Sequence, residues 1–319
     1  MILLFNLVSL DGRSANCKLD DHHEDDSWRY SAVTYHQGSV LACGARQLVD
    51  ADRCWRHNGT AWYELQRSSQ PHCWTDAPSL MVPKGWWVTG PIQIEDGHCS
   101  DQGLWDGTTS PPLRLNNYEW SSEIFTGEKW IEGPPHPLGK YSSEACMVNL
   151  NYTHTMYIGF DPTESPFTLR AWIYDWEAEN WIEIKAPTQR WYYGCVGLGD
   201  GEVLIAGGYD LNTPPPVKRR YEFIVELYDP LKGIWSPQPD LPMKNIDPRR
   251  ATLLNQNGNV LALLNDYERY TEREGSHVYK RSNETGEWSV LEGVELPSWF
   301  NGKAVLVPQD FVPTCLNDE

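Results

Sequence analysis

Eight cysteines carry the most defined chemistry in this chain, and their even number suits complete pairing. There is no Cys-x-x-Cys pair and no histidine at zinc-finger spacing from a cysteine pair, so a structural zinc site is not expected. Oxidised pairs are typical of proteins outside the cytosol. We therefore expect disulfides, with buried free thiols as the alternative, and the connectivity stays open at this point.

Three Asn-x-Ser/Thr sequons begin at Asn58, Asn151 and Asn283. Such sequons accept N-linked glycans on the surface of secreted proteins. With the cysteines, they predict an extracellular protein. The opening segment 1–8 lacks a basic region and a clear cleavage site, so we interpret it as a β-strand and find no convincing signal peptide. No run approaches the roughly 20 apolar residues of a membrane span, so none is expected.

The formal net charge is -18, which argues against a nucleic-acid partner because such binders present a basic surface. The acidic run 20–26 contains two histidines but lacks the glycine and the ligand spacing of a calcium loop. We interpret it as a solvated loop and expect neither a metal nor another cofactor. A Gly-x-Ser-x-Gly elbow and a phosphate-binding loop are both absent from the sequence.

An internal repeat defines the elements that must position these residues. Its tryptophan anchors are spaced by 68, 51, 54 and 53 residues: Trp62, Trp130, Trp181, Trp235 and Trp288. An aromatic residue precedes each anchor by five to nine residues: Trp55, Phe125, Tyr174, Tyr228 and Tyr279. Tryptophan and tyrosine suit half-buried sheet surfaces, so the repeat predicts β-structure.

The clearest copy of the repeat runs from Gln189 to Trp235. It predicts a first strand over 193–198, a turn at Asp200-Gly201, and a second strand over 202–208 that ends in Gly207-Gly208. The third strand, 222–230, ends in Tyr228-Asp229-Pro230, and a fourth begins near Trp235. The double glycine, the Tyr-Asp-Pro and the tryptophan together resemble the kelch motif, whose period is about 50 residues. The other copies keep one glycine or none after the second strand.

The resemblance implies a six-bladed kelch-type β-propeller, an all-β single domain in which each repeat is one four-stranded antiparallel blade. Blades pack face to face because a lone sheet cannot bury both faces. Five blades are expected at about 28–66, 67–133, 138–186, 187–239 and 246–293. A closing blade would combine 1–20 with 299–319, pairing N- and C-terminal strands so that the ring has no exposed sheet edge.

Placing the cysteines on these blades suggests three pairs. Cys43 ends a second strand and Cys54 begins the third strand of the same blade. Cys146 and Cys195 occupy matching first-strand positions in consecutive blades. Cys17 with Cys315 would lock the closing blade, which leaves Cys73 with Cys99 by elimination.

The sequons are all expected in turns at one end of the blades. Asn58 and Asn283 fall between third and fourth strands, and Asn151 falls between a first and a second strand. In an up-and-down sheet these two kinds of turn lie at the same end. The opposite end, built from the 2–3 and 4–1 connections, would stay free of glycans and carries the longest loops, where binding residues concentrate.

Arginine and tyrosine in those loops have the composition of interface hot spots. We expect a ligand site for a protein or an anionic glycan at these residues: Tyr209, Lys218, Arg219, Arg220, Tyr267, Arg269 and Arg273. Basic residues that recur just before first strands are instead expected to be structural: Arg29, Lys140, Arg190 and Arg250. We expect a monomeric binding protein without catalytic activity.

Two other functions stay open. A secreted carbohydrate-active propeller would resemble the galactose oxidases, or the sialidases, whose repeated Ser-x-Asp turn is only approached by 282–288, where a glutamate replaces the aspartate. Intracellular kelch proteins often serve as ubiquitin-ligase substrate adaptors joined to a BTB domain, and no such domain precedes these repeats in the sequence given.

Overall fold

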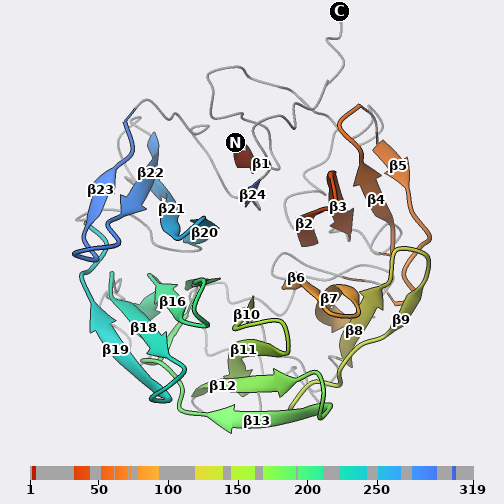
Figure 1. Ribbon diagram of the computed structural model, residues 1–319, viewed down its shortest axis with the longest axis horizontal. Helices are drawn as coiled ribbons and strands as arrows, with labels where there is room; N and C mark the ends of the chain where they lie inside the picture. Colours follow the sequence, from red (N-terminus) through yellow and green to blue (C-terminus); the bar gives the residue numbers. More distant parts are fainter. Residues whose placement is uncertain are drawn as a thin grey trace, which may run out of the picture. The chain divides into compact units, whose positions relative to one another are not determined.

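The computed structural model describes residues 2–4, 32–43, 52–60, 62–70, 72, 78–92, 119–138, 145–161, 168–191, 193–210, 223–242, 251–266, 275–292 and 304–306. Within these residues every regular element is a β-strand. The strands form five four-stranded sheets, each in chain order, and such sheets are the blades of a β-propeller (Figure 1). We number them blades I to V.

Two compact units make up the chain, and the smaller comprises Leu19–Ala145 and Phe160–Thr168. It contains blades I and II. Blade I consists of β2 (Ala32–His36), β3 (Ser39–Cys43), β4 (Cys54–His57) and β5 (Trp62–Glu64). Blade II consists of β6 (Ser79–Val82), β7 (Gly85–Ile92), β8 (Glu119–Phe125) and β9 (Trp130–Glu132).

The larger unit comprises Met1–Lys18, Cys146–Gly159 and Leu169–Glu319. It holds most of blade III, which is β10 (Cys146–Asn149), β11 (His154–Asp161), β12 (Thr168–Asp175) and β13 (Asn180–Ile184). Blade IV is β15 (Gly194–Gly197), β16 (Val203–Ala206), β18 (Val225–Asp229) and β19 (Ile234–Gln238). Blade V is β20 (Thr252–Gln256), β21 (Asn259–Asp266), β22 (Gly275–Arg281) and β23 (Trp288–Val290).

The second strand of each blade is the most deeply buried. Every residue of β3 and β16 is buried, and so are seven of the eight residues of β11. A strand covered on both faces reads as a continuous apolar run rather than an alternating one. In blades IV and V these strands build a core with the residues Leu204, Ala206, Val225, Leu253, Val260 and Ala262. In blades I and II the core contains Ala32, Leu41, Trp86, Val88 and Phe125.

The repeated tryptophans lie at the start of the fourth strands. In blades II, III and IV the predicted aromatic residue is the cross-strand partner: Phe125 faces Trp130, Tyr174 faces Trp181 and Tyr228 faces Trp235. These pairs have ring centroids 4.9 to 5.2 Å apart. Blades I and V differ, because His57 is opposite Trp62 and Arg281 is opposite Trp288.

The double glycine of blade IV marks a break in its inner hairpin. Gly207 and Gly208 have φ values of 75° and 100°, which side chains other than glycine rarely adopt. Beyond this break the chain pairs again as a short ribbon, β14 (Arg190–Trp191) with β17 (Tyr209–Asp210). The glycines therefore let one hairpin continue in a new direction.

Six blades were predicted, and the described residues contain five. The predicted pairing of the terminal segments is present as a two-stranded sheet, in which β1 (Ile2–Leu4) runs antiparallel to β24 (Ala304–Leu306). The predicted third strand of the closing blade, 15–19, lies outside the described residues. The sixth blade is therefore not confirmed.

Candidate functional site

Two glutamates on third strands hold the connections that arrive from the preceding blade. In blade II the Glu123 carboxylate accepts hydrogen bonds from the backbone N–H groups of Ser69 (3.2 Å) and Gln70 (3.0 Å), and from the Ser69 hydroxyl. Nearby, the indole Nε1 of Trp130 donates to the Gln66 carbonyl at 2.8 Å. We call this arrangement, a third-strand glutamate and a fourth-strand tryptophan on one incoming connection, the crossover anchor.

Blade IV repeats the crossover anchor. Glu226 accepts from the backbone N–H and the hydroxyl of Thr188, each at 3.0 Å, and Trp235 Nε1 donates to the Lys185 carbonyl at 2.8 Å. Both glutamates precede the third-strand aromatic residue by two positions, so they occupy the same place in the repeat. The anchors therefore fix the 4–1 connections at the end of the blades where the ligand loops were predicted.

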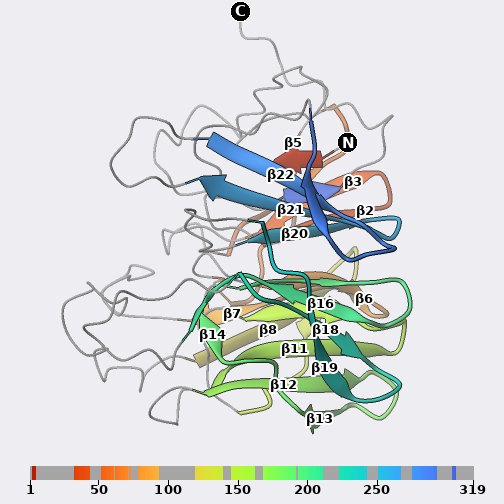
Figure 2. The same ribbon diagram turned by 90° about the vertical axis from the view of Figure 1, so that its left-hand side faces the viewer.

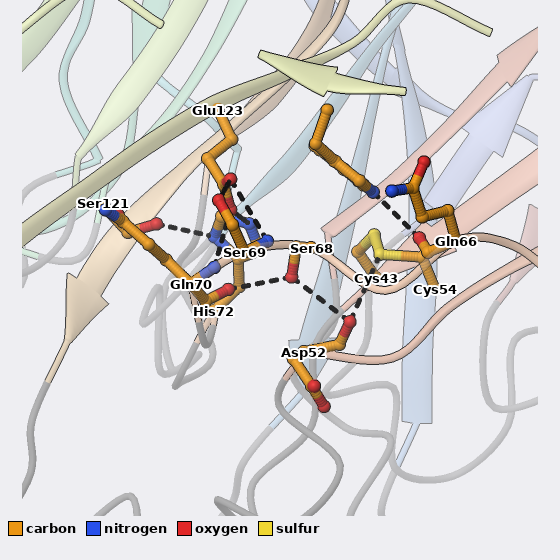
Figure 3. The surroundings of a disulfide bond; sticks show 11 residues. Cys43, Asp52, Cys54, Gln66, Ser68, Ser69, Gln70, His72, Ser121 and Glu123 are labelled. Atoms are coloured by element: carbon orange, nitrogen blue, oxygen red, sulfur yellow. Dashed lines mark hydrogen bonds and ion pairs between the residues drawn. A yellow bond between two sulfur atoms is a disulfide. The ribbon is translucent and has the colours of Figure 1, made fainter. Parts of the chain in front are cut away.

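The two anchors differ in the buried side chain beside the glutamate. Arg190 is fully buried and forms an ion pair with Glu226. In blade II the corresponding partner is His72, which is 1% exposed and places Nε2 3.4 Å from Glu123 Oε2. Figure 3 shows His72 between Glu123 and Ser121, whose Oγ lies 3.2 Å from His72 Nδ1. Arg190 thus has the structural role expected for it.

Glu123 is held as a carboxylate. Burial raises its pKa, but the interaction with His72 and the hydrogen bond from Ser69 outweigh burial, so the pKa lies below its ordinary value. The serine, histidine and glutamate come in the order of a hydrolytic triad. Ser121 is 0% exposed, however, and a nucleophile must reach its substrate. This cluster is therefore a structural network.

The structure brings two of the predicted cysteine pairs together as disulfides. Cys43 and Cys54 are cross-strand neighbours in β3 and β4, with Cα atoms 4.2 Å apart. Cys146 and Cys195 link the first strands of blades III and IV, with Cα atoms 6.2 Å apart. The other predicted partners lie outside the described residues: Cys17, Cys73, Cys99 and Cys315.

The first disulfide is tied to the crossover anchor of blade II. Ser68 donates its backbone N–H (2.9 Å) and its hydroxyl (3.2 Å) to the carbonyl of Asp52, two residues before Cys54 (Figure 3). The Ser68 hydroxyl also approaches the Gln70 carbonyl at 2.8 Å. The disulfide hairpin and the incoming connection are therefore joined through one buried serine.

All three sequons are exposed and lie in the predicted turns. Asn58 joins β4 to β5, Asn151 joins β10 to β11, and Asn283 joins β22 to β23. Asn58 and Asn151 share one geometry. Their Oδ1 atoms accept the backbone N–H of the sequon threonine, at 3.0 and 2.8 Å, and its hydroxyl, at 2.8 and 3.1 Å.

In the larger unit two sequons share one end. Asn255 of β20 donates to the Gly197 carbonyl of β15 at 2.8 Å, and a Cβ on Gly197 would lie 2.8 Å from the Asn149 carbonyl of β10. The first strands β10, β15 and β20 thus end together, where their turns to the second strands begin. Figure 2 shows β20 beside the second and third strands of its own blade, β21 and β22. A Cβ on Gly258, in the turn after β20, would lie 3.8 Å from Asn283 Nδ2. Asn151 and Asn283 are therefore at the same end.

Most predicted ligand residues cannot be placed. Tyr209 is in β17, with its backbone opposite Trp191. The others lie outside the described residues, in the segments that join β17 to β18 and β21 to β22: Lys218, Arg219, Arg220, Tyr267, Arg269 and Arg273. Two described arginines pair with acids: the exposed Arg67 with Asp52 at 3.3 Å, and the half-buried Arg170 with Glu183 at 2.9 Å.

Sequence reasoning missed the anchor residues His72, Ser121, Glu123 and Glu226. A signal was available, because each glutamate stands two positions before the third-strand aromatic residue and a Ser-Gln or Thr-Gln dipeptide precedes the buried partner, His72 or Arg190. Among the described residues, no group of three or more histidine, cysteine or acidic side chains is arranged to hold a metal ion. The search for a helix long and apolar enough to cross a membrane found none in the described part of the chain.

No protein-family model matches the chain. The chain is similar to Kelch-like protein 23 of Mus musculus and of Homo sapiens, at 26% identity over 230 residues, which are 66% of this chain and 38% of each relative. Kelch-like protein 23 of Pongo abelii is 26% identical over 203 residues, 60% of this chain and 34% of the relative. The match thus spans little more than a third of the length of these relatives. The sequence repeat, the four-stranded blades and these similarities together support a kelch-repeat β-propeller.

Proposed function

We propose that this chain is an extracellular, non-catalytic kelch propeller that binds an acidic segment of a partner protein, or else an anionic glycan, through its 2–3 and 4–1 connections. The observation that carries the proposal is the separation of the two ends in the larger unit. Asn151 and Asn283 occupy the turn end, whereas the second strands end and the third strands begin at the opposite end, on either side of segments 211–222 and 267–274.

The crossover anchors support this choice of end. Binding residues work best on loops that a rigid scaffold presents. Glu123 and Glu226 each hold an incoming connection by several hydrogen bonds, so the connections have fixed starting points. The basic cluster Lys218-Arg219-Arg220, with Arg269 and Arg273, would supply the charge that an acidic ligand requires.

The extracellular location is supported by two features of the described residues. Both disulfides are of the kind that persists in oxidising compartments. Exposed Asn58, Asn151 and Asn283 are accessible acceptors for glycans. The alternative, an intracellular adaptor, would require reduced thiols and bare asparagines.

A six-bladed single domain that acts as a monomer is part of the same proposal. The antiparallel pairing of β1 with β24 supports it, because β24 also lies against β20, the first strand of blade V. A closing blade built on this pair would cover the edge that blade V otherwise presents.

The test compares two triple variants in binding to immobilised poly-glutamate and to heparin. One variant replaces Lys218, Arg219 and Arg220 with alanine. The matched control replaces Lys84, Lys129 and Lys232 with alanine. These lysines are exposed in turns at the opposite end of each blade, and their replacement removes the same amount of positive charge. We expect salt-sensitive binding by the unaltered protein and the control, and loss in the loop variant. Poly-glutamate binding would favour the protein ligand, and heparin binding alone the glycan.

Equal loss in both variants would show that only net charge matters and would contradict the proposed site. An unaltered protein that binds neither probe would also contradict it. Adding Arg269→Ala and Arg273→Ala to the loop variant should weaken binding further, because both residues belong to the same proposed surface.

A further inference from the structure

Asn58 is followed by Gly59, and this dipeptide is the one most prone to spontaneous deamidation. In that reaction the backbone nitrogen of the following residue attacks the asparagine side-chain carbonyl, and glycine offers no Cβ to hinder the approach. Asn58 and Gly59 lie in the turn from β4 to β5, where Asn58 is exposed and Gly59 has a φ of 98°. The surroundings of these two residues decide how fast the attack proceeds.

A base is in place for the attacking nitrogen. The Gly59 backbone N–H donates to Nδ1 of His57 at 3.1 Å. His57 is 3% exposed, and burial lowers the pKa of its imidazole, so the ring is neutral and Nδ1 carries a lone pair at neutral pH. The register positions opposite His57 hold Val40 of β3 and Trp62 of β5, neither of which titrates. The titratable residues on the other positions of β4 and β5 are Arg56, Tyr63 and Glu64, and Arg56 Nε donates to the Ser39 hydroxyl at 2.8 Å.

The carbonyl under attack is polarised. Asn58 Oδ1 accepts two hydrogen bonds from Thr60, from the backbone N–H at 3.0 Å and from the hydroxyl at 2.8 Å. Donors at this oxygen stabilise the negative charge that develops when a nucleophile adds to the carbonyl carbon. The nitrogen that leaves in the reaction, Asn58 Nδ2, lies 3.5 Å from the Tyr63 hydroxyl.

We propose that the turn after β4 is a self-modifying site at which Asn58 deamidates with His57 as the general base. The Gly59 nitrogen forms a bond to Asn58 Cγ while its proton passes to His57 Nδ1. The bond from Cγ to Nδ2 then breaks, and the nitrogen takes a proton and leaves as ammonia. Water opens the resulting succinimide at either carbonyl, which gives aspartate or isoaspartate at position 58.

The chain contains its own control for this chemistry. Asn257 and Gly258 form the same dipeptide in the exposed turn from β20 to β21. There the Gly258 N–H donates at 2.8 Å to the side-chain oxygen of Asn255, an amide oxygen that cannot take up the proton at neutral pH. Asn151 has the same two threonine contacts as Asn58, but Tyr152 follows it. The base and the glycine occur together at Asn58.

Deamidation and glycosylation would compete for one atom. An N-linked glycan is attached to Nδ2, the atom that deamidation expels, and aspartate at position 58 is no longer an acceptor. The deamidation step itself does not depend on the proposed function. It can therefore fail while the glycoprotein proposal stands, and the reverse also holds.

The experiment uses the full chain made in a bacterial host, where Asn58 stays bare, with peptide mapping that separates asparagine, aspartate and isoaspartate. During incubation at neutral pH we expect Asn58 to convert at least about tenfold faster than Asn257, a modest contribution for a positioned base. The Asn58 rate should be level across the range in which His57 is neutral, whereas the Asn257 rate should rise with hydroxide. Equal rates, or parallel pH profiles, would overturn the proposal.

Three variants separate the base from the turn itself. His57→Gln removes the basic nitrogen and should slow Asn58 to the rate of Asn257 without changing Asn257. Because His57 is buried, the exposed Thr60 gives a second measurement that leaves the core intact. Thr60→Val should slow conversion, and Thr60→Ser, which keeps the hydroxyl, should restore it. Faster conversion in His57→Gln would mean that His57 protects the site, which is the opposite of the proposal.

Discussion

Arg190 and Glu226 form a buried ion pair that joins two blades of the larger unit. Arg190 arrives on the connection from blade III, and Glu226 lies on the third strand of blade IV. Arg190 Nη1 also donates to the Ile224 carbonyl at 2.8 Å, and its Nε donates to the Thr188 carbonyl at 3.2 Å. Both charges therefore have several partners, as buried charges require.

Removing one member of this pair should lower the stability of the fold. Arg190→Ala leaves the partly buried Glu226 carboxylate without its cation and empties a fully buried site, and we expect the free energy of unfolding to fall by about 3 kcal/mol. The matched control is Arg170→Ala, which breaks the exposed pair with Glu183 and should cost about 1 kcal/mol or less. Urea unfolding curves measure both values. Similar losses in the two variants would contradict a buried anchor.

The tryptophan half of the crossover anchor makes a smaller contribution. Trp235→Phe keeps most of the ring but removes the N–H that bonds the Lys185 carbonyl, and it should cost about 1 kcal/mol plus the effect of the smaller ring. Trp130→Phe should behave alike, because Trp130 donates to the Gln66 carbonyl at the same distance of 2.8 Å. Thermal unfolding of the two variants tests this equivalence, and a loss confined to one blade would argue against a repeated anchor.

The two disulfides should differ in their effect on stability. In the chain-entropy view, opening the Cys43–Cys54 bond, with a separation of 11 residues, costs about 3 kcal/mol, whereas opening Cys146–Cys195, with a separation of 49, costs about 4 kcal/mol. Paired Cys→Ala replacements at each bond, compared by urea unfolding, check the order. A larger loss at the short loop would show that local packing around β3 and β4 outweighs chain entropy.

His136 should make stability depend on pH. Burial lowers its pKa to about 3, and Asp161 only partly opposes this, while its Nδ1 accepts the Leu138 N–H at 3.2 Å. Because the unfolded chain takes up a proton near the ordinary value of 6.5 and the folded chain does not, stability is complete above pH 6.5 and falls as the pH drops towards 3. The slope for one such group approaches about 1.4 kcal/mol per pH unit.

His136→Asn provides the measurement, because the asparagine Oδ1 can accept the same N–H and does not titrate. We expect the variant to lose stability less steeply than the unaltered protein between pH 6.5 and 4, when both are unfolded in urea at each pH. Identical slopes would mean that His136 is protonated in the folded state.

The repeat was readable in the sequence because tryptophan and its aromatic partner recur on adjacent strands of one hairpin. In the structure, Tyr174 faces Trp181 and Tyr228 faces Trp235 across such a hairpin. The pairing is shifted by two residues in blades I and V, where Trp55 and Tyr279 face Glu64 and Val290 instead of the tryptophans. A shift of two residues keeps a side chain on the same sheet face, so composition alone could not detect it.

The crossover anchors could not be predicted from local periodicity. Ser69 and Glu123 are 54 residues apart, and Thr188 and Glu226 are 38 apart, so neither contact lies within one hairpin. The pairing of the aromatic residues with the tryptophans joins neighbouring strands of one blade. The contacts of the crossover anchors form only when a connection meets the next blade. The cysteine pairs were accessible because Cys43 and Cys54 flank one turn, and Cys146 and Cys195 occupy equivalent first strands.

Mass spectrometry of protein from a secretory host, with and without reduction and glycosidase treatment, tests whether this is an extracellular binding protein. We expect peptides linked through Cys43–Cys54 and Cys146–Cys195, and glycans on Asn58, Asn151 and Asn283. Free thiols at these cysteines, together with bare asparagines, would contradict an extracellular binding protein and would favour the intracellular adaptor.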